Sequence, residues 1–309
     1  MRLALNFHAP AIEQMLEQRA PTVELVRVPS GGIPDIAADA LLTPLAGTQA
    51  LVRLLPACRG LKWVHVFGTG VDGFPFDMVR GFRLSCSRGA SAAAMAEWVM
   101  AMMLAVEKRL PEVWLHAPPE RWGAADLGGL AGRTLGLLGF GAVGQELARR
   151  ALAFDMRVLA KVRTHRSSPV AGVLFAQTLD QVLQEAEHLV LALPATAESR
   201  GLLDAERLAR TRPGVHLVNV ARACVLDQEA LRSLLDQGHI ARASLDVVDP
   251  EPLPAGHWLY THPRVRLSPH VSWSAPGTVE RMLEMFLCNL DAFAHGRPLQ
   301  GVVDVAAGY

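Results

Sequence analysis

The stretch RTLGLLGFGAVG, residues 133–144, decides the fold of this chain. Its first half is an apolar run that predicts a buried strand, and its second half is a turn that contains three glycines. A helix is predicted directly after the turn, because the next apolar residues share one helical face: Val143, Leu147, Ala148, Ala151 and Leu152. A strand, a glycine turn and an amphipathic helix in this order begin a βαβ unit.

The glycine turn has the pattern G-x-G-x-x-G, which suits the pyrophosphate of a dinucleotide. Gly139 permits the tight turn, Gly141 lets the backbone approach the pyrophosphate, and Gly144 lets the helix and strand pack closely. The helix N-terminus adds free N–H groups and the positive end of the helix dipole. A tight turn without a ligand is the alternative, but the βαβ context favours a cofactor site. The predicted cofactor contacts here are Gly139, Gly141, Ala142, Val143 and Gly144.

Strands and helices continue to alternate along the chain. Further strands are predicted at 156–161, 188–194, 215–221, 242–248 and 265–270, with helices near 178–186, 204–212 and 227–238. Near-continuous apolar runs such as LVLAL are typical of parallel strands that helices cover on both faces. Residues 1–90 show a weaker version of the same alternation. We therefore predict an α/β fold with two Rossmann-like, doubly wound parallel-sheet domains and an active site in the cleft between them.

Two long helices are predicted near the domain boundaries. One spans residues 91–108 and carries a crossing between domains, and the other spans about 278–295. The tail after it is expected to return to the first domain. We place a substrate-binding, flavodoxin-like domain at residues 1–98 plus 284–309, and a dinucleotide-binding Rossmann domain at residues 99–283.

The composition predicts a globular protein and disfavours several partners. Of 309 residues, 50% are hydrophobic and 19% charged, and 30 Lys and Arg balance 30 Asp and Glu without a basic stripe for nucleic acid. The most apolar segment, residues 92–106, contains Glu97 and is too short to cross a membrane. The four cysteines lie far apart and lack the spacing of a metal site, which fits a reducing compartment. We expect a cytoplasmic protein with no metal, no nucleic-acid partner and no membrane partner.

The end of the second strand of the dinucleotide domain predicts which nicotinamide cofactor is used. The segment AKVRTHR places Val162 where an NAD site usually has an acidic residue. A carboxylate there would repel the 2′-phosphate of NADP, whereas the guanidinium of Arg163 can bind it with two hydrogen bonds. Thr164, His165 and Arg166 can add donors. An ordinary solvated basic loop is the alternative. We predict that NADP(H) is preferred and that NAD(H) is possible.

Three polar residues follow predicted strand ends, where open α/β sheets bind ligands. Arg222 follows VHLVNVA, Glu251 follows RASLDVV, and His270 follows VRLSP. Alone, each has an ordinary explanation as a surface ion pair, a turn residue or a structural histidine. Together they supply a cation for an acidic substrate, a proton donor and a carboxylate that holds the donor protonated, which match the needs of hydride transfer chemistry.

Seven motifs in order make the chain resemble the D-isomer-specific 2-hydroxyacid dehydrogenases, a family that includes glyoxylate and hydroxypyruvate reductases. The motifs are GTGVDGF (68–74), SAAAMAEWVMAMMLA (91–105), LAGRTLGLLGFGAVG (130–144), NVARACVLD (219–227), LDVVDPEPLP (245–254), LSPHVSW (267–273) and GRPLQGVVDVAAGY (296–309). The resemblance implies that Arg222 binds the substrate, that His270 passes the proton, and that Glu251 hydrogen-bonds His270 and favours its protonated form.

The resemblance also implies further contacts with the substrate and the nicotinamide. Backbone N–H groups of Thr69 and Gly70 would hold the substrate carboxylate, and Asp246 would meet the nicotinamide carboxamide. Three residues would line the nicotinamide: Leu193, Pro194 and Ala221.

The chain departs from the family pattern at three positions. Ala223 stands where the usual Arg-Gly pair has its glycine, and Trp273 replaces a small residue three positions after the proton donor. Val162 replaces the usual acidic residue, as in the NADPH-preferring glyoxylate and hydroxypyruvate reductase branch. Because pocket shape separates one 2-keto acid from another, Trp273 is expected to influence substrate choice by narrowing the pocket.

These observations predict an oxidoreductase that reduces a small 2-keto acid, such as glyoxylate or hydroxypyruvate, to the D-2-hydroxy acid. We expect a homodimer formed through the cofactor domain and its Met-rich helix. Formate oxidation is disfavoured, because formate has no keto oxygen and needs no proton relay. A dinucleotide-sensing, corepressor-like binding protein of the same fold is the alternative, and turnover of any 2-keto acid would distinguish the two.

Overall fold

The computed structural model describes residues 1–8, 10–28, 35–44, 48–164 and 167–309, and the chain divides into two compact units. Unit 1 comprises Met1–Ser91 and Ala275–Tyr309, and unit 2 comprises Ala92–Ser274. The boundaries predicted from the sequence, 98/99 and 283/284, lie seven and nine residues later in the chain. The whole of helix α3 (Ala92–Glu107) lies in unit 2, because its buried face packs in one core cluster with helix α4 (Ala142–Ala153).

Unit 2 contains a seven-stranded, fully parallel sheet with the strand order β10-β9-β8-β11-β12-β13-β14. The strands are β8 (Thr134–Leu138), β9 (Arg157–Lys161), β10 (Val173–Phe175), β11 (His188–Leu191), β12 (Val215–Asn219), β13 (Ile240–Leu245) and β14 (Val265–Leu267). The order reverses between β8 and β11, which is the switch point where doubly wound sheets bind dinucleotides. The predicted doubly wound parallel sheet is confirmed.

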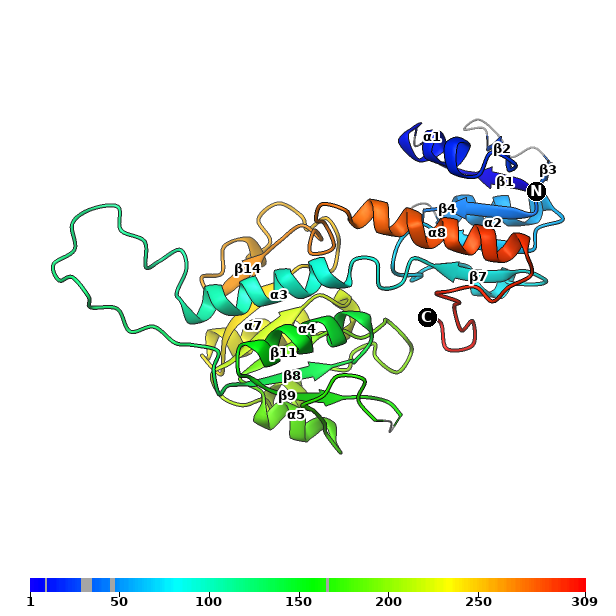
Figure 1. Cartoon of the computed structure of the whole chain (residues 1–309). Helices are drawn as coiled ribbons and strands as arrows, with labels where there is room; N and C mark the ends of the chain where they lie inside the picture. The colour runs from blue at the N-terminus through cyan, green and yellow to red at the C-terminus, as the bar shows by residue number, and fades with distance from the viewer. Residues whose placement is uncertain (9, 29–34, 45–47, 165–166) are drawn as a thin grey trace. The chain divides into compact units, whose positions relative to one another are not determined.

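Helices cover both faces of this sheet, and its strands are mostly apolar, as buried parallel strands usually are. Helices α3 and α4 pack on one face, around Val99, Met103 and Leu147. The other face carries α5 (Leu179–Glu185), α6 (Ala205–Ala209) and α7 (Gln228–Asp236). Figure 1 shows α4 and α5 on opposite sides of β8 and β9. Each helix of the second group begins where a side chain accepts a backbone N–H, and these capping residues are Thr178, Asp204 and Asp227.

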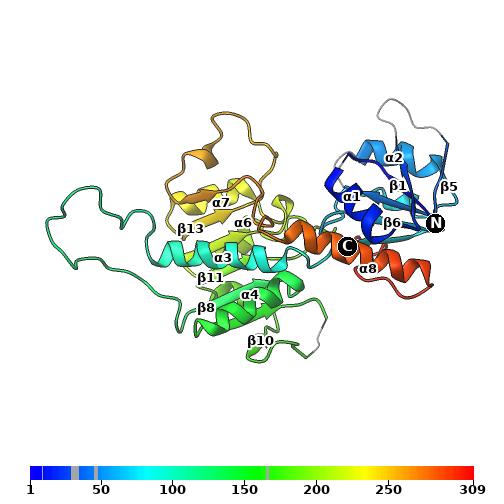
Figure 2. The ribbon, with the colours of Figure 1, turned by 45° about the horizontal axis from the view of Figure 1, so that its top comes forward.

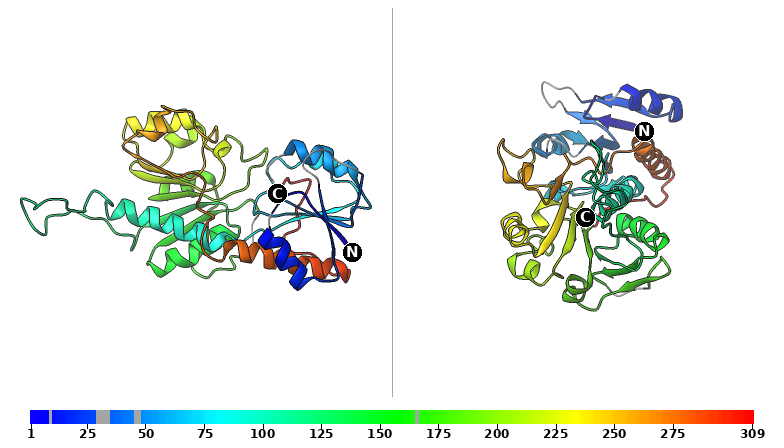
Figure 3. Two further views of the ribbon diagram at one scale, coloured as in Figure 1. Left: turned by 90° about the horizontal axis from the view of Figure 1, so that it is seen from above. Right: turned by 90° about the vertical axis from the view of Figure 1, so that its left-hand side faces the viewer.

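Unit 1 has a five-stranded parallel sheet with the order β2-β1-β4-β6-β7, the flavodoxin-like order. Its strands are β1 (Arg2–Leu5), β2 (Glu24–Arg27), β4 (Ala40–Thr43), β6 (Trp63–Val66) and β7 (Arg83–Cys86). Helices α1 (Pro10–Arg19) and α8 (Thr278–Ala294) pack on one face and α2 (Thr48–Ala57) on the other, as Figure 3 shows. Strands β3 (Ile36–Ala37) and β5 (Cys58–Arg59) form a separate parallel pair.

The C-terminal tail returns to unit 1, as the sequence predicts. The Gly301 carbonyl accepts a hydrogen bond from the Cys86 N–H, and Val302 pairs antiparallel with Ser85. Gly301 has φ +62°, and a Cβ there would lie 2.2 Å from the Cys86 carbonyl oxygen. Only glycine therefore fits this close approach to the edge strand.

The chain between α3 and β8 forms an extended arm, residues 108–129, without helix or strand. Figure 2 shows the arm leaving the end of α3, running away from the sheet of unit 2, and returning before β8. It returns with the Gly128 N–H donating to the Glu107 carbonyl and the Lys108 ammonium donating to the Gly128 carbonyl at 2.7 Å.

Candidate active site

The carboxyl edge of the unit 2 sheet gathers the polar residues that the sequence analysis selected. All seven strands are parallel, so the segments that follow them leave from one edge of the sheet. The glycine turn follows β8, Arg163 follows β9 and Arg222 follows β12. Asp246 and Glu251 follow β13, and His270 follows β14.

The glycine turn has the shape that a pyrophosphate site needs. Gly139 has φ +97°, and a Cβ there would lie 2.5 Å from the Ala192 carbonyl oxygen. A Cβ on Gly144 would lie 2.7 Å from the Gly139 carbonyl oxygen, so both positions require glycine for packing. Gly141 differs, since a Cβ there would meet no described atom within 4 Å. The backbone at Gly141, the N-cap of α4, is therefore open to a ligand, and Ala142 and Val143 begin the helix behind it.

The end of β9 carries the predicted phosphate-binding residues on its exposed side. Val162 packs against the core, whereas the Arg163 side chain is 58% exposed and lies 3.9 Å from the Glu198 carboxylate. Thr164 is also exposed, and His165 and Arg166 lie outside the described residues. Arg163 is thus a solvated cation that can turn toward an anion near this edge.

Arg222 is held at the end of β12 by a residue that the sequence analysis missed. Asn219 is fully buried, donates from Nδ2 to the Arg222 carbonyl at 3.2 Å, and accepts the Ala221 N–H at 3.0 Å. The Arg222 guanidinium also donates to the Ala221 carbonyl at 2.7 Å. A polar residue at the end of the otherwise apolar strand VHLVN was the signal that could have identified Asn219.

His270 and Glu251 form the predicted pair. Nδ1 of His270 lies 2.9 Å from Oε2 of Glu251, and the two side chains are 42% and 39% exposed. The other carboxylate oxygen of Glu251 accepts the Val248 N–H at 3.0 Å, which fixes its orientation. This contact assigns Nδ1 to the carboxylate and leaves Nε2 as the ring atom that can act on a substrate.

Asp246 directly follows β13 at the same edge of the sheet, and only 1% of it is exposed. Its carboxylate accepts hydrogen bonds from the Ser268 hydroxyl and from the N–H groups of Val271 and Ser272. The structure therefore places Asp246 under the loop that carries His270, a contact that the sequence analysis did not predict.

The remaining predicted residues lie in two places. Leu193 and Pro194 follow β11, with the Pro194 carbonyl accepting a hydrogen bond from Ser199, and Ala221 is buried after β12. Thr69 and Gly70 belong to unit 1, in the loop after β6, where the Thr69 carbonyl lies 3.8 Å from the Cys86 sulfur. Each of these residues thus follows the carboxyl end of a parallel strand.

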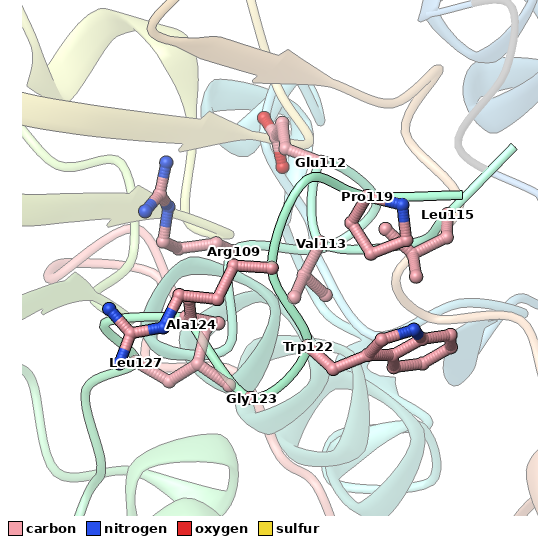
Figure 4. Close-up of a pocket in the computed structure, with 11 residues that line it drawn as sticks. Arg109, Glu112, Val113, Leu115, Pro119, Trp122, Gly123, Ala124 and Leu127 are labelled. Carbon is pink, nitrogen blue, oxygen red and sulfur yellow. The ribbon is translucent and has the colours of Figure 1, made fainter. Parts of the chain in front are cut away.

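The described residues also include a hollow away from this edge, lined entirely by the arm. Figure 4 shows Val113, Leu115, Pro119 and Trp122 around it, with Arg109 and Glu112. It contains none of the residues of the sheet edge. Within the described ranges, no group of three or more His, Cys, Asp or Glu side chains is arranged to hold a metal ion, and no helix is long and apolar enough to span a bilayer.

The glycine turn lies at the switch point of the parallel sheet, and a histidine–glutamate pair lies at the same edge. This combination is typical of a nicotinamide-dependent oxidoreductase. Residues 100–272 match the family model described as "D-isomer specific 2-hydroxyacid dehydrogenase, NAD binding domain". This match covers more than half of the chain, and the chain belongs to that family of NAD(P)-dependent 2-hydroxyacid dehydrogenases.

Individual relatives agree with this assignment. The chain is 32% identical over 284 residues to a glyoxylate reductase of Thermococcus onnurineus, covering 85% of this chain and 84% of the relative. It is 32% identical to a D-3-phosphoglycerate dehydrogenase of Bacillus subtilis, covering 87% of this chain but only 52% of the relative, about half its length. Among solved structures, the NADPH-dependent glyoxylate/hydroxypyruvate reductase of Sinorhizobium meliloti, in complex with NADP and sulfate, superposes with a TM-score of 0.86 at 26% identity. That superposition covers 100% of this chain and 99% of the other.

Proposed function

We propose that this protein is an NADPH-preferring reductase of a small 2-keto acid, with glyoxylate and hydroxypyruvate as the first candidates and the D-2-hydroxy acid as product. The observation that carries the proposal is the 2.9 Å contact between His270 Nδ1 and Glu251, which orients the ring with Nε2 available as a proton donor. The relatives named glyoxylate reductase and glyoxylate/hydroxypyruvate reductase support the substrate class.

In this mechanism the chain's own residues bind the acid and move one proton. Arg222 binds the substrate carboxylate and polarises the keto oxygen, and Asn219 fixes the backbone on which Arg222 stands. His270, protonated on both nitrogens, donates the Nε2 proton to the oxygen as negative charge develops there. Glu251 accepts the Nδ1–H bond and offsets the positive charge of the ring. The dinucleotide, when bound, supplies the hydride to the carbonyl carbon.

Residues of the sheet edge fit a nicotinamide dinucleotide. The open backbone at Gly141 and the N-terminus of α4 would hold the pyrophosphate, with Gly139, Ala142, Val143 and Gly144 shaping the turn. Leu193, Pro194, Ala221 and Asp246 remain the proposed neighbours of the nicotinamide. Arg163 and Thr164 would bind the 2′-phosphate of NADP, and NAD(H) would be accepted more weakly because that anion is missing.

Two residues of unit 1 are also proposed to bind the substrate. The N–H groups of Thr69 and Gly70 would hold the substrate carboxylate, so both domains would contribute residues that bind the substrate. The four free cysteines remain compatible with the proposed cytoplasmic location.

The proposed homodimer has support from the arm that follows the Met-rich helix α3. Its large apolar side chains are strongly exposed: Trp114 is 61% exposed, Leu115 55% and Trp122 79%. Apolar groups concentrated in one exposed segment are typical of an interaction surface. A second copy of this chain is the proposed partner, and a molar mass of twice the chain mass by light scattering is the expected result.

The function is tested by initial rates of NAD(P)H oxidation at 340 nm with glyoxylate, hydroxypyruvate and larger 2-keto acids. We expect turnover, with NADPH clearly better than NADH. Arg163→Ala should reduce the preference for NADPH about ten- to several-hundredfold, the worth of one or two charge-assisted hydrogen bonds. Equal losses with both cofactors would remove the phosphate-binding role of Arg163. Dinucleotide binding without turnover of any acid would contradict the enzyme proposal and favour the sensing-protein alternative.

A further inference from the structure

The loop that carries His270 holds this residue in an unusual backbone conformation. His270 has φ +56°, in the left-handed region that residues with a Cβ rarely adopt. The neighbouring elements are regular, with β14 ending at Leu267 and a tight turn after Val271. A non-glycine residue in this conformation persists only where surrounding contacts impose it. The contacts of residues 268–273, which we call the His270 loop, therefore indicate what holds the proton donor in place.

Asp246 holds the His270 loop from the protein interior. Oδ1 accepts the Ser268 hydroxyl at 2.5 Å and the Val271 N–H at 2.8 Å, and Oδ2 accepts the Ser272 N–H at 2.9 Å. These bonds use three of the roughly four acceptor positions of a carboxylate and fall on both sides of His270. Asp246 is 1% exposed, so bulk solvent has little access to these hydrogen bonds.

Trp273 holds the same loop from the solvent side. Its indole N–H donates to the His270 carbonyl at 3.0 Å, and 38% of Trp273 is exposed. This hydrogen bond links the His270 carbonyl to the side chain three residues later. Because the direction of that carbonyl depends on φ of His270, the bond favours the observed backbone conformation.

We propose that Asp246 and Trp273 are positioning residues that fix His270 in its left-handed conformation, so that Nδ1 meets Glu251 and Nε2 faces the substrate. This inference rests on the proposed function, in which His270 donates the proton. It gives Asp246 a role that is independent of any contact with the nicotinamide. It also gives Trp273 a role other than narrowing the pocket, because the indole N–H, not the bulk of the ring, makes the hydrogen bond to the His270 carbonyl.

The test compares two identical substitutions, Trp273→Phe and Trp258→Phe. The first removes the N–H that binds the His270 carbonyl, and the second removes an indole N–H that has no hydrogen-bond partner among the described residues. Trp273→Phe should lower kcat about fivefold, the worth of one neutral hydrogen bond, with KM for the keto acid nearly unchanged. Trp258→Phe should change neither quantity.

A second variant and a second measurement test the positioning of His270 separately from the proposed reductase activity. Asp246→Asn should lower kcat by roughly a hundredfold, as expected for a misplaced donor. The ring N–H signal of His270, assigned in the ¹⁵N-histidine spectrum with the help of His270→Ala, should broaden in Trp273→Phe and remain sharp in Trp258→Phe. The inference is overturned if the two Phe variants give the same kcat and the same His270 signal. If the wild type shows no turnover, the proposed function fails, and the His270 signal alone decides whether Trp273 positions the ring.

Discussion

A histidine and a glutamate meet in opposite surroundings in unit 2, once in its interior and once at the carboxyl edge of its sheet. In the interior, His188 of β11 lies 3.2 Å from the Glu107 carboxylate and 3.0 Å from His216 of β12, whose other nitrogen lies 2.9 Å from the Ser244 hydroxyl. His188 and His216 are 1% and 2% exposed. At the carboxyl edge, His270 also has a glutamate partner, but its side chain is 42% exposed.

The difference shows that a carboxylate partner alone does not make a histidine chemically available. In the interior, both nitrogens of both rings are bound by protein groups, so no proton can reach a ligand. Burial and the neighbouring His188 lower the pKa of His216 well below its ordinary value, which keeps it neutral. Burial alone would raise the pKa of Glu107, but bonds and charges of His188 and Arg133 outweigh it and lower the pKa. His270 differs in having one ring nitrogen left for a substrate.

The largest expected effect is the loss of the histidine at the edge. His270→Ala should lower kcat about 10²- to 10⁴-fold, the usual contribution of a general acid. Binding of NADPH, followed by its fluorescence, should stay within about twofold of the wild type, because the glycine turn and Arg163 are unchanged. Comparable turnover in the variant would sink the assignment of His270 as proton donor.

A substitution in the interior arrangement should lower the stability of the protein without changing its activity. His216→Leu removes the partner of both His188 and Ser244, and it should reduce the free energy of unfolding by roughly 2–6 kcal/mol, since each of the two buried groups left unpaired costs about 1–3 kcal/mol. Activity per folded molecule should be nearly unchanged. His116→Leu, at an exposed histidine of the same unit, is the control and should shift stability by less than about 0.5 kcal/mol in urea unfolding. A loss of kcat in folded His216→Leu would instead mean that the buried histidines contribute to catalysis, as His270 is proposed to do.

The edge arrangement could be predicted from the sequence, whereas the interior one could not. Arg222, Glu251 and His270 each follow an apolar run, and parallel strands deliver their ends to one edge whatever the details of packing. The histidines within HLVLALP and VHLVNVA carry no comparable signal. Their contact depends on the register of β11 against β12, which pairs His188 with His216. Register is set by the packing of the whole sheet, so two histidines 28 residues apart give no local indication of their contact.

The same limit applies to the residues that support the site. The glycine turn was predictable because glycine is required by local geometry, as the 2.5 Å approach at Gly139 shows. The roles of Asn219 and Ser268 depend on loop conformations that form only after the strands have paired. The sequence pattern predicted which residues meet at the edge of the sheet, but the hydrogen bonds that hold them there required the structure.

The smallest expected effect is on the pH dependence of stability, and it concerns a buried histidine of unit 1, His65. His65 is fully buried between the hydroxyls of Ser85 and Ser87, and burial lowers its pKa to about 3. Because the unfolded chain binds a proton near pH 6.5 and folded His65 does not, this contribution to stability is full above pH 6.5 and is lost as pH falls toward 3. At pH 5 the loss should be about 2 kcal/mol, from 1.36 kcal/mol per pH unit. His65→Gln should therefore be destabilised less than the wild type when urea unfolding is compared between pH 7 and pH 5. An identical pH dependence in the two proteins would mean that His65 is not held neutral, whereas a shallower dependence in His65→Gln would show that the fold keeps this buried histidine from protons.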